Sequence, residues 1–386
     1  MTLRWFLSKT VRQATDLRRQ AQVVINEQRD VLNPNAAVEF NRALEEFDRV
    51  TKSAKDNAVW EKAANDLEAA ASKWLQPYPN PGARENLKEF LVSAVFILSI
   101  FCFFAQPMKI PTGSAQPTLF GNVITDIRMD PTVTIPSGWG KAKDWFLGLD
   151  YYDWVASDDG EFRMAKPDAL FGIFKRQRFF IGKDSFTAWF PAEQLTQACA
   201  PYLGVPFHKG ESVLKMRVLN GDRLFVDRLT YNFRHPERGE TIVFDSTGIP
   251  EIIQNTYYIK RLIGLPGEHI RIGNDRHVIV NGKRLDGTTP HFENVYAFTG
   301  PPHESVYSGH VNEIVAREAG RGGLARHFPD ENAEFIVRPH HFLAFGDNTM
   351  NSNDGRNWGD FPNEKVVGKA LFVFWPLTSR FGLVNR

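Results

Sequence analysis

Residues 109–119 read KIPTGSAQPTL, and they follow directly on an apolar run that extends from Phe90 to Ala105. One glycine and two prolines within the stretch favour a fixed turn. Ser114 lies in this turn, just outside a hydrophobic segment, where a nucleophile acting at a membrane surface would lie. Most serines in such loops are only turn residues. Ser114 is therefore a candidate whose role depends on the rest of the chain.

The composition is that of a globular protein with a sizeable core. A chain of 386 residues has room for about two or three domains, and its 31 phenylalanines supply apolar surface. Its 46 basic and 45 acidic side chains nearly cancel, which argues against a nucleic-acid-binding protein. Cys102 lies in the apolar run and Cys199 lies far beyond it, so we expect no disulfide.

The first part of the chain has the pattern of amphipathic helices. From about residue 3 to residue 75 it is rich in Ala, Glu, Lys, Arg and Gln, and its apolar residues recur at spacings of three and four. Breaks fall at 33–35 and near 56–57, and the proline-rich segment QPYPNPG at 76–82 ends the helical pattern. We therefore predict a helical hairpin or short coiled coil in a cytoplasmic domain, residues 1–82.

The apolar run predicts one transmembrane helix, residues 87–108. Its sixteen residues from Phe90 to Ala105 carry no charge, and apolar side chains cover every face. A buried core helix is the competing interpretation. Lys73, Arg84 and Lys88 precede the run and only Lys109 follows it closely. This bias favours a cytoplasmic N-terminal domain and an extracytoplasmic remainder.

Residues 109–386 predict a β-rich domain of barrel or sandwich type. Short apolar or alternating segments are separated there by Gly, Pro and Asn. Two stretches interrupt the pattern, an inserted subdomain at about 121–215 and a cap at about 285–334. The insertion interleaves many Phe and Trp residues with basic ones. These aromatics indicate either the core of a subdomain or a surface that dips into lipid headgroups.

A serine nucleophile needs a base, because its hydroxyl is hardly ionised at neutral pH. The histidines show no HExxH pattern and no Cys/His set has zinc spacing, so no metal is predicted. Lys260 lies within the apolar segment YYIKRLI, residues 257–263. Burial would lower its pKa, as a lysine base requires. On the segment alone, the favoured interpretation is that Lys260 points outward from an alternating strand.

Four sequence blocks then match a known family in order. They are QPMKIPTGSAQPTL (106–119), NGDRLFVDR (220–228), YIKRLIGLPGE (258–268) continuing to VNGK (280–283), and GDNTMNSNDGRNWG (346–359) followed by VGKA (367–370). With them, the region from about Arg84 to Pro376 resembles the bacterial type I signal peptidases, or leader peptidases, of the Ser-Lys S26 family. The resemblance implies a mainly β catalytic domain of signal-peptidase-like fold, behind one transmembrane helix and the N-terminal α-helical domain.

The resemblance also implies roles for single residues. Ser114 matches the nucleophile and Lys260 the general base. Thr112 and the Ser114 backbone N–H match the oxyanion hole, and Ser352 matches the serine that orients the lysine. Three further matches are structural charges around the lysine strand: Asp354, Arg356 and Arg261.

The implied activity is that of a membrane-bound serine endopeptidase. Relatives of this kind cleave N-terminal signal peptides from exported preproteins, after small residues at the −1 and −3 positions. The implied partners are these preproteins and membrane lipid, with the secretion machinery as a further candidate. No nucleic acid and no cofactor are implied. The implied location is the inner (cytoplasmic) membrane, crossed once.

Several positions depart from the family pattern. Ala115 stands where most relatives carry methionine, Thr112 replaces the usual serine, and Thr349 and Gly355 also differ. The insertion of nearly a hundred residues between Leu119 and Asn220 is the largest departure. Two alternatives therefore stay open: a Ser-Lys peptidase specialised for a narrow substrate, such as a pilin-type precursor or the protein itself, and a catalytically silent relative that binds exported chains.

Overall fold

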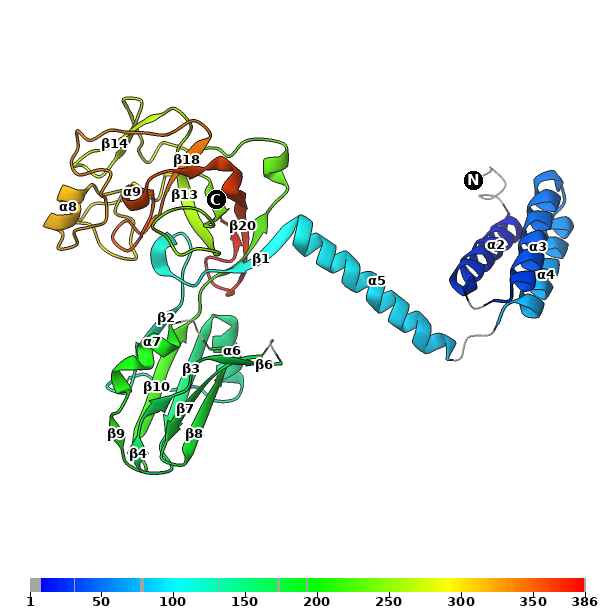
Figure 1. The fold of residues 1–386 in the computed structure, drawn as a ribbon, viewed down its shortest axis with the longest axis horizontal. Helices are drawn as coiled ribbons and strands as arrows, with labels where there is room; N and C mark the ends of the chain where they lie inside the picture. The colour runs from blue at the N-terminus through cyan, green and yellow to red at the C-terminus, as the bar shows by residue number, and fades with distance from the viewer. Residues whose placement is uncertain are drawn as a thin grey trace. The chain divides into compact units, whose positions relative to one another are not determined.

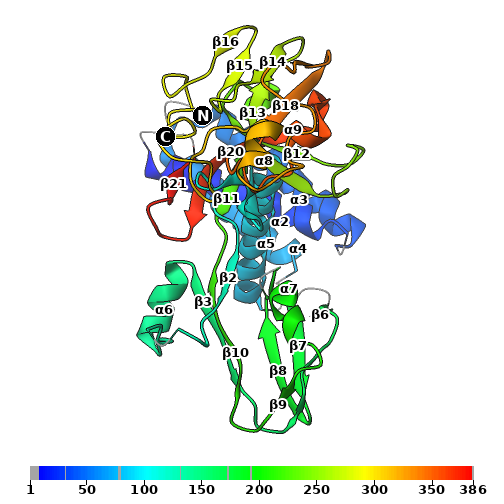
Figure 2. The same ribbon diagram turned by 90° about the vertical axis from the view of Figure 1, so that its left-hand side faces the viewer.

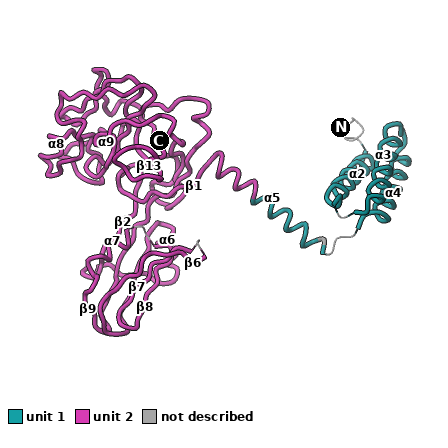
Figure 3. The backbone as a smooth tube through the Cα atoms, viewed as in Figure 1, with its two compact units in different colours: residues 1–94 teal, residues 95–386 magenta. Residues whose placement is uncertain are grey.

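The computed structural model describes residues 8–384, apart from 31, 77–79, 131, 172–173 and 192–193 (Figure 1, Figure 2). The middle of the predicted proline-rich break therefore lies outside the described residues. The chain divides into two compact units, residues 1–94 and 95–386 (Figure 3). Helices form the first unit and strands dominate the second, as the sequence predicts.

The N-terminal unit contains three amphipathic helices, α2 (Lys9–Gln28), α3 (Pro34–Ser53) and α4 (Asn57–Trp74). Each begins at a side chain that accepts a hydrogen bond from a backbone N–H of the first turn, namely Ser8, Asn33 and Asp56. Their apolar faces meet in one core built on Phe40, Leu44, Phe47 and Leu67. The helix α4 packs against both α2 and α3. The predicted hairpin is thus a three-helix arrangement.

The apolar run lies in α5 (Pro81–Phe103). Among the described residues, one helix is long and apolar enough to cross a membrane, Gly82–Phe103, with a mean hydropathy of 1.8 and none of its most apolar window buried. At 1.5 Å per residue it is about 33 Å long, which matches the roughly 30 Å of hydrocarbon in a bilayer. The helix ends five residues before the predicted boundary at 108, because residues 105–109 pair as a strand instead.

An eight-stranded antiparallel sheet forms the centre of the second unit. Its order is β1-β11-β20-β12-β13-β18-β19, and β21 pairs with β20. Buried apolar side chains on its strands form the cores of the domain. The strands are β1 (Ala105–Lys109), β11 (Arg223–Asp227), β12 (Thr241–Asp245), β13 (Tyr257–Gly264), β18 (His341–Phe345), β19 (Phe361–Pro362), β20 (Val366–Trp375) and β21 (Gly382–Leu383).

A smaller sheet of order β16-β15-β14-β17 lies beside the cap. Its strands are β14 (His269–Ile272), β15 (Val278–Val280), β16 (Lys283–Arg284) and β17 (Phe335–Ile336). The predicted cap, 285–334, contains α8 (Glu313–Glu318) and packs Phe292, Val295 and Phe328 into one core with Ile270 and Phe345. The cap therefore packs against the eight-stranded sheet. The short helix α9 (Gly355–Trp358) follows β18.

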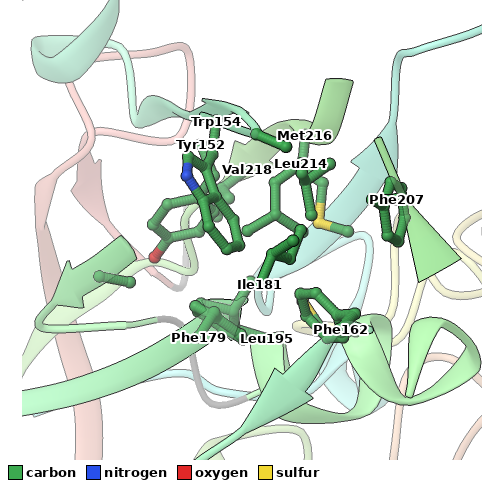
Figure 4. Close-up of a cluster of buried hydrophobic side chains, with 14 residues drawn as sticks. Tyr152, Trp154, Phe162, Phe179, Ile181, Leu195, Phe207, Leu214, Met216 and Val218 are labelled. Atoms are coloured by element: carbon green, nitrogen blue, oxygen red, sulfur yellow. The ribbon is translucent and has the colours of Figure 1, made fainter. Parts of the chain in front are cut away.

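The insertion is a β subdomain with a core of its own (Figure 4). In Figure 1 and Figure 2 the insertion extends from the eight-stranded sheet on the side opposite β14. Aromatic and aliphatic side chains fill it, among them Trp154, Phe162, Phe179 and Met216. Its elements are β2 (Val123–Asp126), α6 (Trp139–Phe146), β3 (Leu149–Val155), β4 (Gly160–Glu161), β5 (Arg163–Met164), β6 (Asp168–Leu170), β7 (Phe174–Ile181), β8 (Asp184–Trp189), α7 (Leu195–Cys199), β9 (Pro206–Phe207) and β10 (Ser212–Leu219).

Candidate active site

The candidate nucleophile lies on a short 3-10 turn, Gly113–Ala115, that follows β1. Ile110, Ala115 and Leu119 are buried in a cluster with Leu224 and Val226 of β11, so the chain is anchored both before and after Ser114. Ala115, which replaces the family methionine, is thus a core residue. Ser114 itself is only partly buried. A rigid loop therefore presents this serine toward the surface.

Lys260 lies on β13 with only 3% of its surface exposed. Its Nζ is 2.6 Å from Ser114 Oγ, although 146 residues separate the two in the chain. The side chain points inward, not outward as an alternating strand also allows. At this distance an ammonium donates to the hydroxyl, whereas a neutral amine accepts the hydroxyl proton.

The surroundings of Lys260 favour its neutral form. Burial lowers its pKa from the ordinary 10.5 to about 8, and it outweighs the nearby carboxylates of Asp354 and Asp347, which raise the pKa. Both carboxylates are held by arginines, Asp354 by Arg356 and Asp347 by Arg261. Neither is left to pair with the lysine, and Arg356 further lowers the lysine pKa.

Asp354 and Arg356 form a fully buried pair at the start of α9, with N–O contacts of 2.9 Å. Asp354 also accepts from the backbone N–H of Gly346 at 2.8 Å. Arg356 donates to the hydroxyl and carbonyl oxygens of Thr349 at 2.7 and 2.8 Å. Thr349, a departure from the family pattern, therefore accepts two of the hydrogen bonds that the buried guanidinium of Arg356 donates. Burial alone would raise the pKa of Asp354, but Arg356 lowers it below its usual value.

Arg261 pairs with Asp347 through contacts of 2.6 and 2.7 Å, and both are at least 95% buried. Asp347 also accepts a 2.5 Å hydrogen bond from Thr118, four residues after Ser114. Arg261 donates further to the carbonyls of Gly239 and His291. This pair thus ties the lysine strand, the nucleophile loop and the cap together.

Two predicted site residues are less engaged. Ser352 is buried beside the Asp354–Arg356 pair. Its Oγ has no hydrogen-bond partner among the described residues, so the expected bond to Lys260 is not formed. A Cβ on Gly346 would lie 2.2 Å from Ser352 Oγ and 2.5 Å from the Ser114 carbonyl, so only glycine allows this approach. Thr112 is exposed and extended, and its hydroxyl caps none of the amides of the 3-10 turn.

Comparisons with known proteins show which family the chain belongs to. A family profile described as signal peptidase, peptidase S26, matches residues 196–375. A probable signal peptidase I-2 from Synechocystis sp. is 33% identical over 206 residues, which cover 53% of this chain and 76% of that protein. The chain belongs to the S26 signal peptidase family. It is a serine peptidase, and the activity of the family is the cleavage of signal peptides.

Other relatives extend the match. A signal peptidase I from Pseudomonas fluorescens is 29% identical over 250 residues, covering 58% of this chain and 82% of that protein. A solved signal peptidase I from Enterococcus faecalis V583 is 23% identical, covers 35% of this chain and 97% of that chain, and has a TM-score of 0.22. The family profile, 196–375, does not include the helical unit, residues 1–94.

Asn348 is a site residue that sequence reasoning did not single out. It is fully buried, its backbone N–H donates to the Ser114 carbonyl at 3.1 Å, and its Nδ2 donates to the Gly113 carbonyl at 3.0 Å. One residue of the loop after β18 therefore holds two successive carbonyls of the nucleophile turn. The only sequence signal was its place in the fourth block, which indicates no contact.

Replacing Asn348 tests this positioning role in the peptidase. Asn348→Ala keeps the backbone N–H but removes the donor to Gly113, so the turn loses one of its two supports. We expect kcat to fall by about 10- to 100-fold with little change in KM, because small displacements of a nucleophile are costly. Asn351→Ala, an exposed amide of the same loop, is the control and should retain activity. Wild-type kcat in Asn348→Ala would contradict the role.

Proposed function

We propose that the chain is a membrane-bound endopeptidase that releases exported preproteins from their signal peptides with a Ser114–Lys260 dyad. The distance of 2.6 Å between Lys260 Nζ and Ser114 Oγ carries the proposal, since the lysine is buried and its pKa is lowered to about 8. A lysine in that state accepts a proton near neutral pH.

The proposed reaction has two halves. Neutral Lys260 takes the proton of Ser114 Oγ as the oxygen attacks the carbonyl carbon at the cleavage site. The scissile C–N bond breaks, and the lysine ammonium gives the proton to the leaving amine. Lys260, neutral again, then takes a proton from water. The hydroxide attacks the ester carbonyl, the bond between the acyl carbon and Ser114 Oγ breaks, and the signal-peptide carboxylate leaves. Ser114 Oγ takes the proton back from the Lys260 ammonium, which restores both groups.

Thr112 and Ser352 have supporting roles in this mechanism. The Thr112 hydroxyl and the Ser114 backbone N–H would stabilise the oxyanion, for which the exposed threonine side chain is open to substrate. Ser352 Oγ, buried without a partner among the described residues, leaves a hydroxyl available to the lysine. A buried hydroxyl without a hydrogen bond costs about 1–3 kcal/mol, so a bond to Lys260 during the reaction would be favourable.

Location and specificity are part of the proposal. We propose that α5 spans the inner membrane once, with the helical unit in the cytoplasm and the catalytic unit outside, near both preproteins and the secretion machinery. Cleavage after small −1 and −3 residues follows the family resemblance, because shallow pockets exclude large side chains. No cofactor takes part in the proposed steps.

A narrower substrate range is the second candidate. The insertion reaches the nucleophile loop, since Gln194 Nε2 donates a hydrogen bond to the Pro111 carbonyl, directly before Thr112. A subdomain that contacts this backbone is placed to restrict which chains enter the site. A protein specialised in this way would cleave one precursor and leave general preproteins intact.

Cleavage of a preprotein with an A-x-A site by the detergent-solubilised full chain tests the proposal. We expect one cut after the −1 alanine, identified by mass spectrometry of both products. The same preprotein with Phe at −1 should be cleaved at least about 10²-fold more slowly. A cut at another position would contradict the assigned specificity. No cut in any of several preproteins would favour the narrow-substrate candidate or a silent binding protein.

A further inference from the structure

Four aromatic side chains gather at one end of a sheet in the insertion, and we call them the aromatic tip: Phe171, Phe174, Trp189 and Phe190. Their exposed fractions are 83%, 44%, 49% and 63%. They come together because β6 pairs Leu170 with Phe174 and the Phe190 N–H donates to the Lys175 carbonyl at 2.8 Å. The rings of Phe174 and Phe190 are 6.1 Å apart. The tip therefore places four exposed apolar side chains at one end of the sheet.

The core of the subdomain does not need these side chains. Along β7, the alternate residues Gln177, Phe179 and Ile181 point inward and are fully buried, whereas Phe174 and Lys175 at its start are exposed. The interior is already filled by its own aromatic cluster (Figure 4). Contiguous exposed aromatic surface on a soluble domain typically marks a contact with a partner or a membrane.

The backbone holds two of the aromatics outward. Phe171 and Phe190 have φ values of +53° and +48°, in the left-handed region that bulky side chains disfavour. This conformation costs roughly 1–2 kcal/mol per residue. Both residues lie in the turns that end β6 and β8, on either side of β7. Such strained conformations cluster at functional sites, where the surrounding structure holds them in place.

Basic side chains accompany the tip. Residues 166–178 hold four of them (Lys166, Lys175, Arg176 and Arg178) and one acidic residue, Asp168, a net charge of +4 − 1 = +3, whereas the whole chain is +1. Asp168 is shared between Arg176 at 2.7 Å and Arg178 at 3.2 Å. Aromatic rings beside unpaired positive charge suit the interface of a bilayer that contains anionic lipid.

The proposed membrane span also places a bilayer next to the unit that carries the tip. The second unit carries the last nine residues of α5, 95–103, so a membrane crossed by α5 begins at this unit. Figure 1 and Figure 3 show the β6 end of the insertion on the side of the unit from which these residues leave. We propose that the aromatic tip inserts into the headgroup layer of the same bilayer, as a second membrane contact of the catalytic unit; this rests on the proposed span.

Spin labels report depth in the intact chain, reconstituted in vesicles of phosphatidylglycerol and phosphatidylethanolamine. Cys102 is exposed and is changed to Ala, whereas Cys199 is buried, with its pKa raised to about 12, and does not react. Single labels then replace Phe171, Val95 of α5, and Leu203, an exposed apolar residue elsewhere on the insertion. Collision with oxygen reports lipid, and collision with a water-soluble nickel chelate reports water.

We expect the label at 171 to favour oxygen and the label at 203 to favour nickel. The label at 95 tests the span separately. If position 95 is deep while 171 is as open to nickel as 203, the tip proposal is wrong and the span stands. If 95 also lies in water, the proposed span itself is wrong.

An activity measurement covers the case in which a label disturbs the tip. The double change Phe171→Ser with Phe190→Ser removes the outermost rings without touching the core. We expect cleavage of a vesicle-embedded preprotein to fall about tenfold, and cleavage of a short soluble peptide to stay unchanged. Leu203→Ser is the control and should alter neither rate. Equal rates for the double variant and wild type on the embedded preprotein would overturn the proposal.

Discussion

Ser114→Ala and Lys260→Met should each lower kcat/KM for preprotein cleavage by about 10³- to 10⁴-fold. Alanine removes the attacking oxygen, and methionine keeps the apolar stem of the lysine while removing its amine. Because Lys260 Nζ and Ser114 Oγ are 2.6 Å apart, the two groups act as one unit. The double variant should therefore be no slower than either single variant.

The Lys260→Met variant should fold at least as well as wild type. Burying an amine at 3% exposure is unfavourable in its charged form, and methionine avoids that cost. Unchanged or higher thermal stability at neutral pH thus separates lost chemistry from lost structure. Lys283→Met, an exposed lysine of β16, is the matched control and should cleave at the wild-type rate. Cleavage by Lys260→Met within about tenfold of wild type would exclude the lysine as the base.

The pH dependence of kcat/KM is a second test of Lys260 as the base. Only the neutral amine accepts a proton, and the pKa of Lys260 is lowered from 10.5 to about 8. Wild-type kcat/KM should therefore fall about tenfold for each pH unit below about 8 and level off above it. A lysine with an ordinary pKa would instead give a rise that continues beyond pH 10. A flat profile between pH 6 and 9 would contradict lysine as the base.

The sequence predicts the helical first unit and the proposed Ser114–Lys260 dyad, but for different reasons. Helical spacing and the apolar run are local patterns, so the helices of the N-terminal unit and α5 follow from them directly. Ser114 and Lys260 lie 146 residues apart, and only the resemblance connected them before the structure showed their contact. A lone lysine in an apolar strand does not reveal which way it points.

The remaining features depend on contacts between distant segments. The insertion pairs β2 with β10, so residues 123–126 align with 216–219 across about ninety residues of chain, and no local pattern encodes that pairing. α5 ends before the predicted boundary because residues 105–108, which carry no charge and so extend the apolar pattern, pair with β11 instead. The role of Asn348 depends on the loop it touches, which the sequence does not show.

Arg356→Met should destabilise the catalytic unit by about 3–5 kcal/mol, because it leaves Asp354 charged and unpaired in the interior. Both side chains are fully buried, and their contacts are 2.9 Å long. Arg284→Met is the control: Arg284 and Asp275 are 3.0 Å apart but half exposed, and such pairs contribute up to about 1 kcal/mol. Denaturant unfolding in detergent, with the helical unit followed separately, measures both changes.

The loss of unfolding free energy in Arg356→Met should depend on pH. In wild type, Arg356 keeps the pKa of Asp354 below 3.8, so the pair stabilises the fold above that pH and the contribution is lost as pH falls through the folded-state pKa. In the variant, burial without the arginine raises the pKa of Asp354, so the carboxylate binds a proton on mild acidification. The difference between the two proteins should therefore shrink as pH falls. A difference that is constant from pH 7 to pH 4 would exclude an unpaired Asp354 charge as its cause.

Arg356→Met should also shift the pH dependence of kcat/KM, which a simple loss of folded protein would not do. Arg356 lowers the pKa of Lys260 and Asp354 raises it, so removal of the arginine leaves an unpaired carboxylate that favours the lysine ammonium. The midpoint of the kcat/KM profile should move above about 8, and activity lost at neutral pH should return in part at higher pH. Arg284→Met should leave the midpoint in place. Reduced activity with an unshifted midpoint would mean that Arg356 supports the fold without setting the protonation of the base.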